Sequence, residues 1–204
     1  MQAMIHIIGQ GGIGSYLDEK LAKLQQSNQL IRVDGTSYQL AGYDDDEVEL
    51  KNLDYQNFLE EDLNEQKAIV LGKRYNLMGQ DFRVDQIKDI ITCDDDIIIC
   101  CVDSAGFRRS MFEEMQDLPN QWIDLRCHGR IVACYVKHEQ NTYEFLLSTL
   151  PEEEGEDEGS CQRQEDLDAG IIQMGNQIAA PIGCQKLLNI LRGVDQSPRF
   201  VHQF

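Results

Sequence analysis

The sequence contains no Cys-x-x-Cys pair, and this absence excludes the commonest arrangement of zinc ligands. Its seven cysteines are odd in number, so a disulfide framework is not expected in a chain of 204 residues. We interpret the cysteines as mostly core residues of a reduced protein, and we expect a cytoplasmic location and no zinc.

Basic residues are scarce: 18 Lys and Arg stand against 36 Asp and Glu, which gives a net charge of −18 at pH 7. A field of this sign repels phosphate backbones and anionic lipid, so we expect no nucleic-acid or membrane-surface binding. Long hydrophobic runs are missing too, since the longest, residues 97–102, is far too short to span a membrane. The first residues carry neither a basic region nor an apolar leader, and we expect no signal peptide. A small anionic ligand in a local pocket remains compatible with this charge.

Short apolar segments alternate with segments of helical periodicity along the chain. Residues 4–8 are apolar and rich in β-branched side chains, which predicts a buried strand, and leucines recur at helical spacing over residues 15–25. Residues 97–102 are apolar on both faces, as in a central parallel strand. The other expected strands are 30–35 or 37–43, 82–84, 122–125, 130–137 and 143–147. The other expected helices are 67–77, 105–118 and 169–191, the last of them kinked or broken near Pro181.

This order of elements predicts the fold class. Strands that alternate with helices and end in a cluster of strands indicate an α/β protein with a Rossmann-like, doubly wound, mostly parallel sheet. We expect an antiparallel strand extension, a C-terminal helix and a single domain over residues 1–204. The acidic stretch at 152–159 lies in a loop at about 151–166, which we expect to be mobile because like charges resist packing. Residues 194–204 show no interpretable pattern.

A glycine-rich motif, G-x-G-x-x-G, occupies residues 9–14 between the first expected strand and helix. Gly9 would permit the tight turn, Gly11 would let the backbone approach a phosphate, and Gly14 would let helix and strand pack closely. The start of the helix would add free N–H groups and partial positive charge. Packing alone is the alternative role for these glycines. The motif is also typical of NAD-dependent oxidoreductases, in which Asp34, twenty residues after Gly14, would hold the ribose hydroxyls.

A second motif follows at residues 44–56 with the skeleton D-x-D-x-V-x-x-x-N-L-x-x-Q, and Lys67 comes shortly after it. A dehydrogenase has no use for this pattern. Together with the glycine motif, it resembles the ThiF/MoeB/HesA family, the adenylating relatives of ubiquitin-activating enzymes. The resemblance runs from residue 4 to about residue 147 and includes the C-terminal helix.

The resemblance implies a nucleotide site that neutralises charge building up on the reacting phosphorus of ATP. It implies that Asp44 binds the ribose and that Lys67 is the phosphate cation. The other implied nucleotide-binding residues are Gly9, Gly11, Gly12, Gly14, Asp46, Asn52 and Gln56. Asp103, just after the strand 97–102, is implied to hold Mg2+, and Arg108 matches a recurrent family arginine. Without the other motifs, Asp103 would be interpreted as the N-cap of the helix that follows.

The activity that the resemblance implies is ATP- and Mg2+-dependent adenylylation of a C-terminal carboxylate. The implied substrate is a small ubiquitin-like or sulfur-carrier protein that ends in Gly-Gly, and a homodimer is expected because family members usually pair. Many members also use a cysteine in a loop after the sheet for thioester or persulfide chemistry. Cys161 is the best-placed cysteine, although nearby acidic residues disfavour its thiolate.

Three departures from the family pattern keep other interpretations open, and one of them is the absence of the paired Cys-x-x-Cys zinc site that bacterial members carry. Tyr55 stands where the family usually has an arginine, and tyrosine is neutral at pH 7. The helix that often precedes the first strand, with an arginine that reaches a neighbouring subunit's nucleotide, is not found in this sequence. The alternatives are therefore a catalytically degenerate member that binds nucleotide or a partner, and an NAD-dependent oxidoreductase that uses Asp34.

Overall fold

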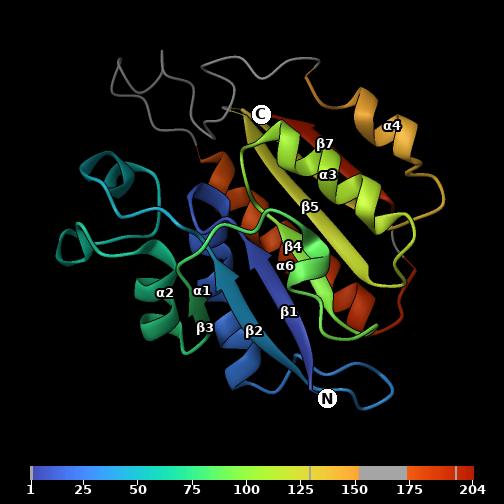
Figure 1. The fold of residues 1–204 in the computed structure, drawn as a ribbon, viewed down its shortest axis with the longest axis horizontal. Coiled ribbons are helices and arrows are strands. Elements are labelled where there is room, and N and C mark those ends of the chain that lie inside the picture. Colours follow the sequence, from blue (N-terminus) through green and yellow to red (C-terminus); the bar gives the residue numbers. More distant parts are fainter. Residues whose placement is uncertain (1, 129, 152–173, 196) are drawn as a thin grey trace.

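A seven-stranded sheet forms the centre of the computed structural model, which describes residues 2–128, 130–151, 174–195 and 197–204 (Figure 1). Its strand order is β3-β2-β1-β4-β5-β6-β7. The strands are β1 (Ala3–Ile8), β2 (Tyr38–Tyr43), β3 (Met78–Gln80), β4 (Ile97–Cys100), β5 (Gln121–His128), β6 (Ile131–Val136) and β7 (Arg199–Gln203). The first five in chain order are parallel, and β6 and β7 are added antiparallel. The predicted fold class, a mostly parallel α/β sheet with an antiparallel extension, is confirmed.

Helices cover both faces of this sheet (Figure 1). α1 (Gly12–Gln26) and α6 (Gly175–Leu191) pack against one face, and α3 (Ala105–Met115) and α4 (Tyr143–Ser148) pack against the other. α2 (Lys67–Tyr75) packs against the edge strand β3. Short 3-10 helices occupy Leu50–Asp54, Glu60–Asp62 and Ile87–Asp89.

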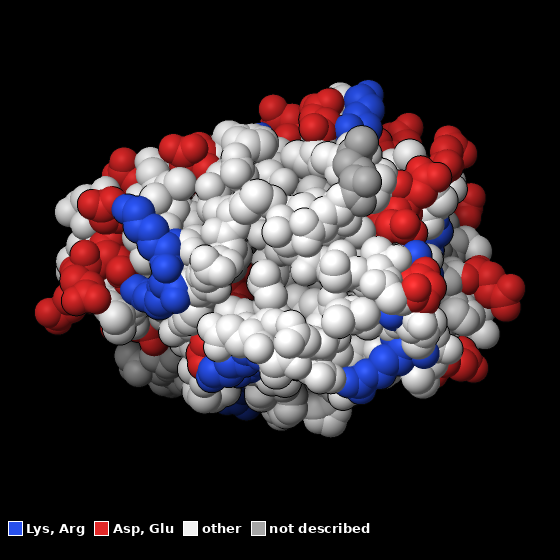
Figure 2. All heavy atoms as spheres, turned by 90° about the horizontal axis from the view of Figure 1, so that it is seen from below, with Lys and Arg blue, Asp and Glu red and all other residues white. Residues whose placement is uncertain are grey.

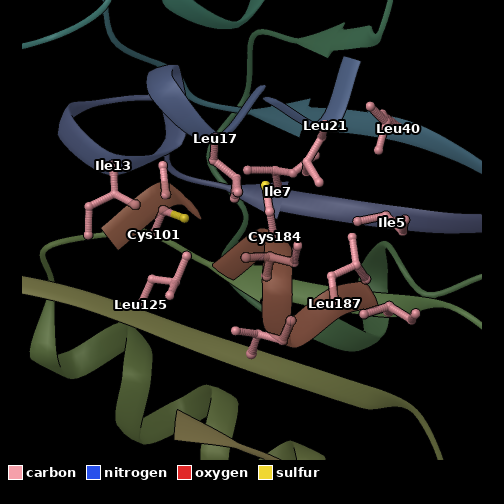
Figure 3. Close-up of a cluster of buried hydrophobic side chains, with 14 of the residues drawn as sticks. Ile5, Ile7, Ile13, Leu17, Leu21, Leu40, Cys101, Leu125, Cys184 and Leu187 are labelled. Atoms are coloured by element: carbon pink, nitrogen blue, oxygen red, sulfur yellow. The ribbon is translucent and has the colours of Figure 1, made fainter. Parts of the chain in front are cut away.

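Alternate residues of the central strands enter two separate cores. From β1, Ile5 and Ile7 join the cluster under α1 and α6, whereas Met4 and Ile8 join the cluster under α3. Figure 3 shows the first cluster, where side chains of α1 and α6 meet those of β1. Because both faces are covered, the strand shows no polar alternation. Each fully buried isoleucine contributes about 1.5–3 kcal/mol to stability.

The prediction of a strand at residues 143–147 is wrong, because these residues form α4. Thr142 caps this helix, and its hydroxyl accepts a hydrogen bond from Phe145 N at 3.3 Å. Such a cap supplies a partner for an N–H that the helix leaves free, and here it outweighs the β propensity of the aromatic residues.

The prediction of a strand at residues 82–84 is also wrong, since the edge strand is β3. Gly79 at the centre of β3 lets the strand approach α2, because a Cβ there would lie 2.1 Å from Ala68 O. Glycine carries no β-propensity, so the sequence pattern did not indicate this strand. Of the two candidates for the second strand, 37–43 contains β2, and 30–35 contributes only an isolated bridge.

Two features of the C-terminal part bear on the sequence-based expectations: α6 is not broken at Pro181, and a strand lies where the sequence showed no pattern. α6 continues through Pro181, and the carbonyl that loses its hydrogen-bond donor belongs to Gln177, an exposed residue. Residues 194–204 contain the edge strand β7, all of whose residues are exposed. Among the described residues, no helix is both long enough and apolar enough to cross a membrane.

Candidate functional site

The carboxyl ends of three neighbouring parallel strands meet at one edge of the sheet. Ile8, the last residue of β1, pairs with the last residues of β2 and β4, Tyr43 and Cys100. The glycine loop at residues 9–14, the D-x-D motif and the segment leading to Asp103 therefore start side by side. The strand order changes direction at β1, and open α/β sheets bind ligands at such switch points.

Two of the loop glycines are required by the packing of the chain. Gly9 has a φ of +87°, and a Cβ there would lie 2.9 Å from the backbone N of Val102. A Cβ on Gly14 would lie only 1.9 Å from Gly9 O. These glycines let β1, the turn and α1 pack closely, so they do not by themselves indicate a ligand.

Gly11 differs, because a Cβ there would make only ordinary van der Waals contacts. The nearest atom that a Cβ there would meet is Gln56 Nε2, at 3.8 Å. Gly12 is covered by Asn176 of α6, whose Nδ2 would lie 2.4 Å from a Cβ. Gln56 Oε1 and Asn176 Oδ1 are buried, and neither has a hydrogen-bond partner among the described residues. Two amides and the free N–H groups of a helix start thus surround the loop, which fits the phosphate or ribose of a nucleotide.

Asp44 fastens the glycine loop to the end of β2. Its Oδ2 accepts a hydrogen bond from Gln10 N at 2.6 Å, and its Oδ1 accepts one from Asp46 N at 3.0 Å. Burial raises the pKa of Asp44, while the Lys67 ammonium and these two N–H groups act in the opposite direction. In doubly wound folds, an acidic residue at the end of the second strand holds ribose hydroxyls.

Lys67 begins α2 and brings a positive charge to the same corner. Its side chain is 7% exposed, and its Nζ lies 2.7 Å from Oδ2 of Asp46, whose side chain is 68% exposed. Its backbone N also donates to Asp46 O at 2.9 Å. The buried ammonium thus reaches the surface at the D-x-D motif, where a phosphate oxygen is an equivalent partner.

The segment between the D-x-D motif and α2 is held by a hydrogen bond within it and by another to α6. Asn52 is buried in the first 3-10 helix, and its Oδ1 accepts a hydrogen bond from Glu49 N at 2.8 Å. Tyr55 O accepts a hydrogen bond from Asn176 Nδ2 at 3.4 Å, which joins the segment to α6. Asn52 and Gln56 lie here as the motif suggested, but Asn176 was missed because it belongs to no local motif and comes far later in the chain.

Asp103 is exposed and directly follows Val102, which packs against Gly9. Ser104, not Asp103, caps α3: the Ser104 hydroxyl accepts a hydrogen bond from Phe107 N at 3.1 Å. The N-cap alternative for Asp103 is therefore wrong, and its carboxylate is not used to begin the helix.

Carboxylates at two places on this edge suit a hard cation. Asp103 is one of them, and oxygens of Asp44, Asp45 and Asp46 lie within 4.8 Å of one another at the other. Mg2+ is usually held by one or two carboxylates together with phosphate oxygens. The donor chemistry fits Mg2+, and its assignment to Asp103 stays a prediction.

Arg108 is buried beneath Asp103 and makes structural contacts. Its guanidinium donates to Asp124 Oδ1 at 2.8 Å, to Asp103 O at 3.2 Å and to Leu125 O at 3.1 Å. Burial alone would raise the pKa of Asp124, but the charges of Arg108 and Arg126 lower it below its usual value. Arg108 thus ties the backbone of Asp103 to β5, and its contact with a nucleotide stays a prediction.

The opposite edge of the sheet holds Asp34, which precedes β2 and pairs with Arg32. The acidic residue at the carboxyl end of β2 is Asp44, so the prediction that Asp34 holds an NAD ribose is wrong. A cavity of about 530 Å³ lies at this opposite edge, lined in part by Arg32, Tyr38 and Asp95. Figure 2 looks onto this end of the molecule, where uncharged residues form most of the centre and charged residues lie mainly around the rim.

None of the six described cysteines forms a disulfide, and four of them are buried. Burial raises the pKa of Cys100 to about 12, as expected of a core thiol. The described residues do not include Cys161 or nearly all of the loop expected at 151–166. The thiol role of Cys161 and the mobility of that loop therefore stay predictions.

The model of the ThiF family matches the chain over residues 1–204. The chain belongs to the ThiF family. Its sequence-based assignment is thereby confirmed, whereas no curated protein sequence matches the chain.

Solved structures share the fold of this ThiF-family chain. MccB of E. coli with MccA-N7isoASN is 16% identical, with a TM-score of 0.67 over 99% of this chain and 61% of that chain. MccB with ATP is 17% identical, with a TM-score of 0.63 over 99% of this chain and 60% of that chain. PaaA is 13% identical, with a TM-score of 0.64 over 100% of this chain and 61% of that chain. The chain therefore spans about three fifths of the length of these structures.

Proposed function

We propose that this chain transfers the adenylyl group of ATP to a carboxylate at the end of a peptide or small carrier protein. The observation that carries the proposal is the corner formed by Gly11, Asp44 and Lys67. It combines the backbone of a helix start, where even a Cβ would not clash, with a carboxylate placed for ribose and a cation placed for phosphate. Membership of the ThiF family supports the same activity, and MccB has been determined with ATP.

In the proposed reaction, a carboxylate oxygen of the substrate attacks the α-phosphorus of ATP. The new P–O bond gives an acyl adenylate, while the bond to the β-phosphate oxygen breaks and pyrophosphate leaves with the electron pair. Negative charge builds up on the phosphoryl oxygens in this step. Lys67 and the N–H groups at the start of α1 stabilise that charge, and Mg2+ held by Asp103 would screen the leaving pyrophosphate.

The remaining residues of the site bind and orient the nucleotide. Asp44 accepts hydrogen bonds from the ribose hydroxyls, and Asp46 holds Lys67 in place until a phosphate replaces it. The amide of Gln56 lies beside Gly11 and can donate or accept, depending on which end it presents. Asn52 keeps the intervening segment in register, because its hydrogen bond caps the 3-10 helix before Gln56.

The proposed substrate is a small ubiquitin-like or sulfur-carrier protein with a C-terminal Gly-Gly, activated by a homodimer. This choice rests on the motif resemblance at residues 44–56, and a thiol step at Cys161 would follow adenylation. A substrate of another kind is an outcome of the same experiment, since MccB has been determined with MccA. Light scattering tests the dimer, and the mass of a single 204-residue chain at micromolar concentration would contradict it.

ATP–pyrophosphate exchange tests the activity. The purified chain, given ATP, Mg2+, labelled pyrophosphate and a candidate carrier, should form labelled ATP, and the same carrier lacking its last two glycines should not. Lys67→Ala should reduce the exchange rate about a hundredfold or more, because it removes a charge that acts at the reacting phosphates. Lys73→Ala, an exposed position on the same helix, is the matched control and should exchange normally. Full activity of Lys67→Ala would show that the phosphate site is placed wrongly.

The second candidate function is nucleotide or partner binding without transfer, and Tyr55 is the observation that favours it. Calorimetry with ATP separates the two. ATP binding without exchange, tested over a range of carriers and peptides, would favour the binding function over the enzymatic one.

A further inference from the structure

Gln10 and Asp18 form a buried polar pair behind the glycine loop. Gln10 lies in the loop and Asp18 lies further along α1, and both residues are 0% exposed. Gln10 Nε2 lies 3.5 Å from Asp18 Oδ1. The remaining polar atom of each side chain, Gln10 Oε1 and Asp18 Oδ2, is buried without a hydrogen-bond partner among the described residues.

A proton on Asp18 Oδ2 would supply the donor that Gln10 Oε1 lacks. If Asp18 is a carboxylate, its Oδ2 and Gln10 Oε1 are both acceptors, and two acceptors cannot bond to each other. If Asp18 is a neutral acid, its Oδ2–H donates to Gln10 Oε1 while its Oδ1 accepts from Gln10 Nε2. The carboxylic acid and the amide then form a closed ring of two hydrogen bonds, which removes both unsatisfied groups.

The groups that face Asp18 favour the neutral acid. Asp44, in the loop after β2, faces it with a like charge, and Cys101 after β4 and Cys184 of α6 are thiols whose pKa values are raised by burial. Burial raises the pKa of Asp18 well above its usual range, Asp44 adds to this effect, and the hydrogen bond from Gln10 opposes it.

The Gln10 side chain also fixes the position of the glycine loop against β2. A Cβ on Gly42 would lie 2.7 Å from Gln10 Nε2, so the amide packs directly on the strand that leads to Asp44. The backbone N of the same Gln10 donates to Asp44 at 2.6 Å. A chain of contacts therefore runs from Asp18 through Gln10 to the carboxylate proposed to hold the ribose.

We propose that Asp18 is a positioning residue: as a neutral acid it pairs with the Gln10 amide and so holds the Gln10 N–H in place for Asp44. The consequence for nucleotide binding rests on the proposed function, whereas the acid–amide pair itself does not. Ionisation of Asp18 breaks the pair and places a second negative charge near Asp44. Nucleotide affinity should therefore fall as pH rises through the folded-state pKa of Asp18.

The stability of the fold also depends on whether Asp18 is protonated. The folded chain keeps the proton of Asp18 at pH values where the unfolded chain has lost it, because the pKa is raised on folding. This contribution to stability is complete below the unfolded pKa and is lost as pH rises toward the folded pKa. Over that interval the folding equilibrium constant of the wild type should fall about tenfold per pH unit relative to a variant that cannot ionise at residue 18.

Asp18→Asn tests the pair, because its Nδ2 can donate to Gln10 Oε1 and its Oδ1 can accept from Gln10 Nε2, but it cannot ionise. Asp18→Asn should retain ATP affinity and lose the part of the pH dependence of affinity and stability that Asp18 contributes. Asp18→Leu cannot bond to Gln10 and should bind ATP about tenfold more weakly. Glu61→Gln, an exposed carboxyl away from the loop, is the control and should keep the wild-type pH profile.

The infrared difference spectrum between wild type and Asp18→Asn provides a readout that needs no nucleotide. Wild-type protein at neutral pH should show the carbonyl stretch of a protonated carboxylic acid, and Asp18→Asn should lack it. The proposal is overturned if this band is missing and the stability of wild type and Asp18→Asn has the same pH profile. If the band is present but neither protein binds ATP, the nucleotide function fails, and with it the role of Asp18 at the ribose. If Asp18→Leu does not fold, the comparison of wild type with Asp18→Asn still decides whether the acid–amide pair exists.

Discussion

Asp103 and Ser104 are adjacent residues with different tasks, and this difference can be measured. Ser104 caps α3, whereas the exposed carboxylate of Asp103 does not take part in the cap. Asp103→Ala should reduce pyrophosphate exchange about a hundredfold or more, because Mg2+ would lose its protein ligand at the reacting phosphates, and it should leave the melting temperature unchanged. Ser104→Ala should do the opposite: it should lower stability by about 0.5–2 kcal/mol and keep exchange. If both variants changed the exchange rate and the stability in the same way, a metal role for Asp103 would be contradicted.

Tyr55 allows a gain-of-function test by a single substitution. The family usually has an arginine at this position, and Tyr55 is a half-buried residue whose carbonyl is held by Asn176. Tyr55→Arg adds a positive charge next to Gln56 at the proposed nucleotide site, so it should increase the exchange rate if transition-state charge limits turnover. Tyr55→Gln, a neutral polar replacement, is the matched control. An exchange rate that is unchanged or lower in Tyr55→Arg would show that the missing arginine is not what limits this protein.

Residues in local motifs were predictable from the sequence, and residues that act across the fold were not. Asp44 and Lys67 belong to a motif with fixed spacing, and the structure brings them together. Asn176 and Asp18 have no such motif: each acquires its place only when α6 and α1 pack around the loop. Asp34 was a wrong candidate because counting residues from the glycine motif cannot locate the end of β2.

The turn between β1 and α1 shows how a single element can serve both folding and binding. A methyl group at Gly14 would lie 1.9 Å from Gly9 O, whereas one at Gly11 would meet the Gln56 amide at 3.8 Å, an ordinary contact. Gly14→Ala should therefore destabilise the fold by about 1–3 kcal/mol through overpacking. Gly11→Ala should destabilise the fold less than Gly14→Ala and should weaken ATP binding, since its methyl group lies beside the loop. Denaturant titration and calorimetry on both variants measure this, and normal ATP affinity in Gly11→Ala would place the phosphates elsewhere.

Elements with a strong pattern of their own were predicted, and elements made by their surroundings were missed. β4 is apolar on both faces and α1 has leucines at helical spacing, so both could be predicted. β3 contains Gly79 and depends on close approach to α2, while β7 is an exposed edge strand that exists only by pairing with β6. α4 is decided by its cap at Thr142, a local signal that the aromatic residues masked.

The fold class of the whole molecule followed from the order of elements, because a parallel sheet needs a crossover between most of its strands. That order produced the switch point at β1 and hence the edge where the site lies. The net charge of −18 made general binding of polyanions unfavourable, yet it did not exclude a buried cation, Lys67, whose ammonium lies beside Asp46 at the candidate site. Composition therefore limited the expected partners of the molecule, the motif named Lys67 as the exception, and the structure placed Lys67 beside Asp44 and Asp46.

Whether the chain binds ATP or NAD can be measured through the stability of the whole molecule. Any ligand that binds only the folded state raises the free energy of unfolding. At a ligand concentration a hundred times the dissociation constant, the gain is about 2.7 kcal/mol. For a chain of 204 residues, each 1 kcal/mol shifts the melting temperature by about 2–4 °C. ATP with Mg2+ should therefore raise the melting temperature by several degrees, and NAD should not, because the motif at residues 44–56 resembles that of adenylating enzymes and the chain belongs to the ThiF family. Asp44→Asn should reduce the ATP shift and Asp34→Asn should leave it intact. Stabilisation by NAD alone, lost in Asp44→Asn, would show that this edge binds a dinucleotide and that the adenylyl-transfer proposal is wrong.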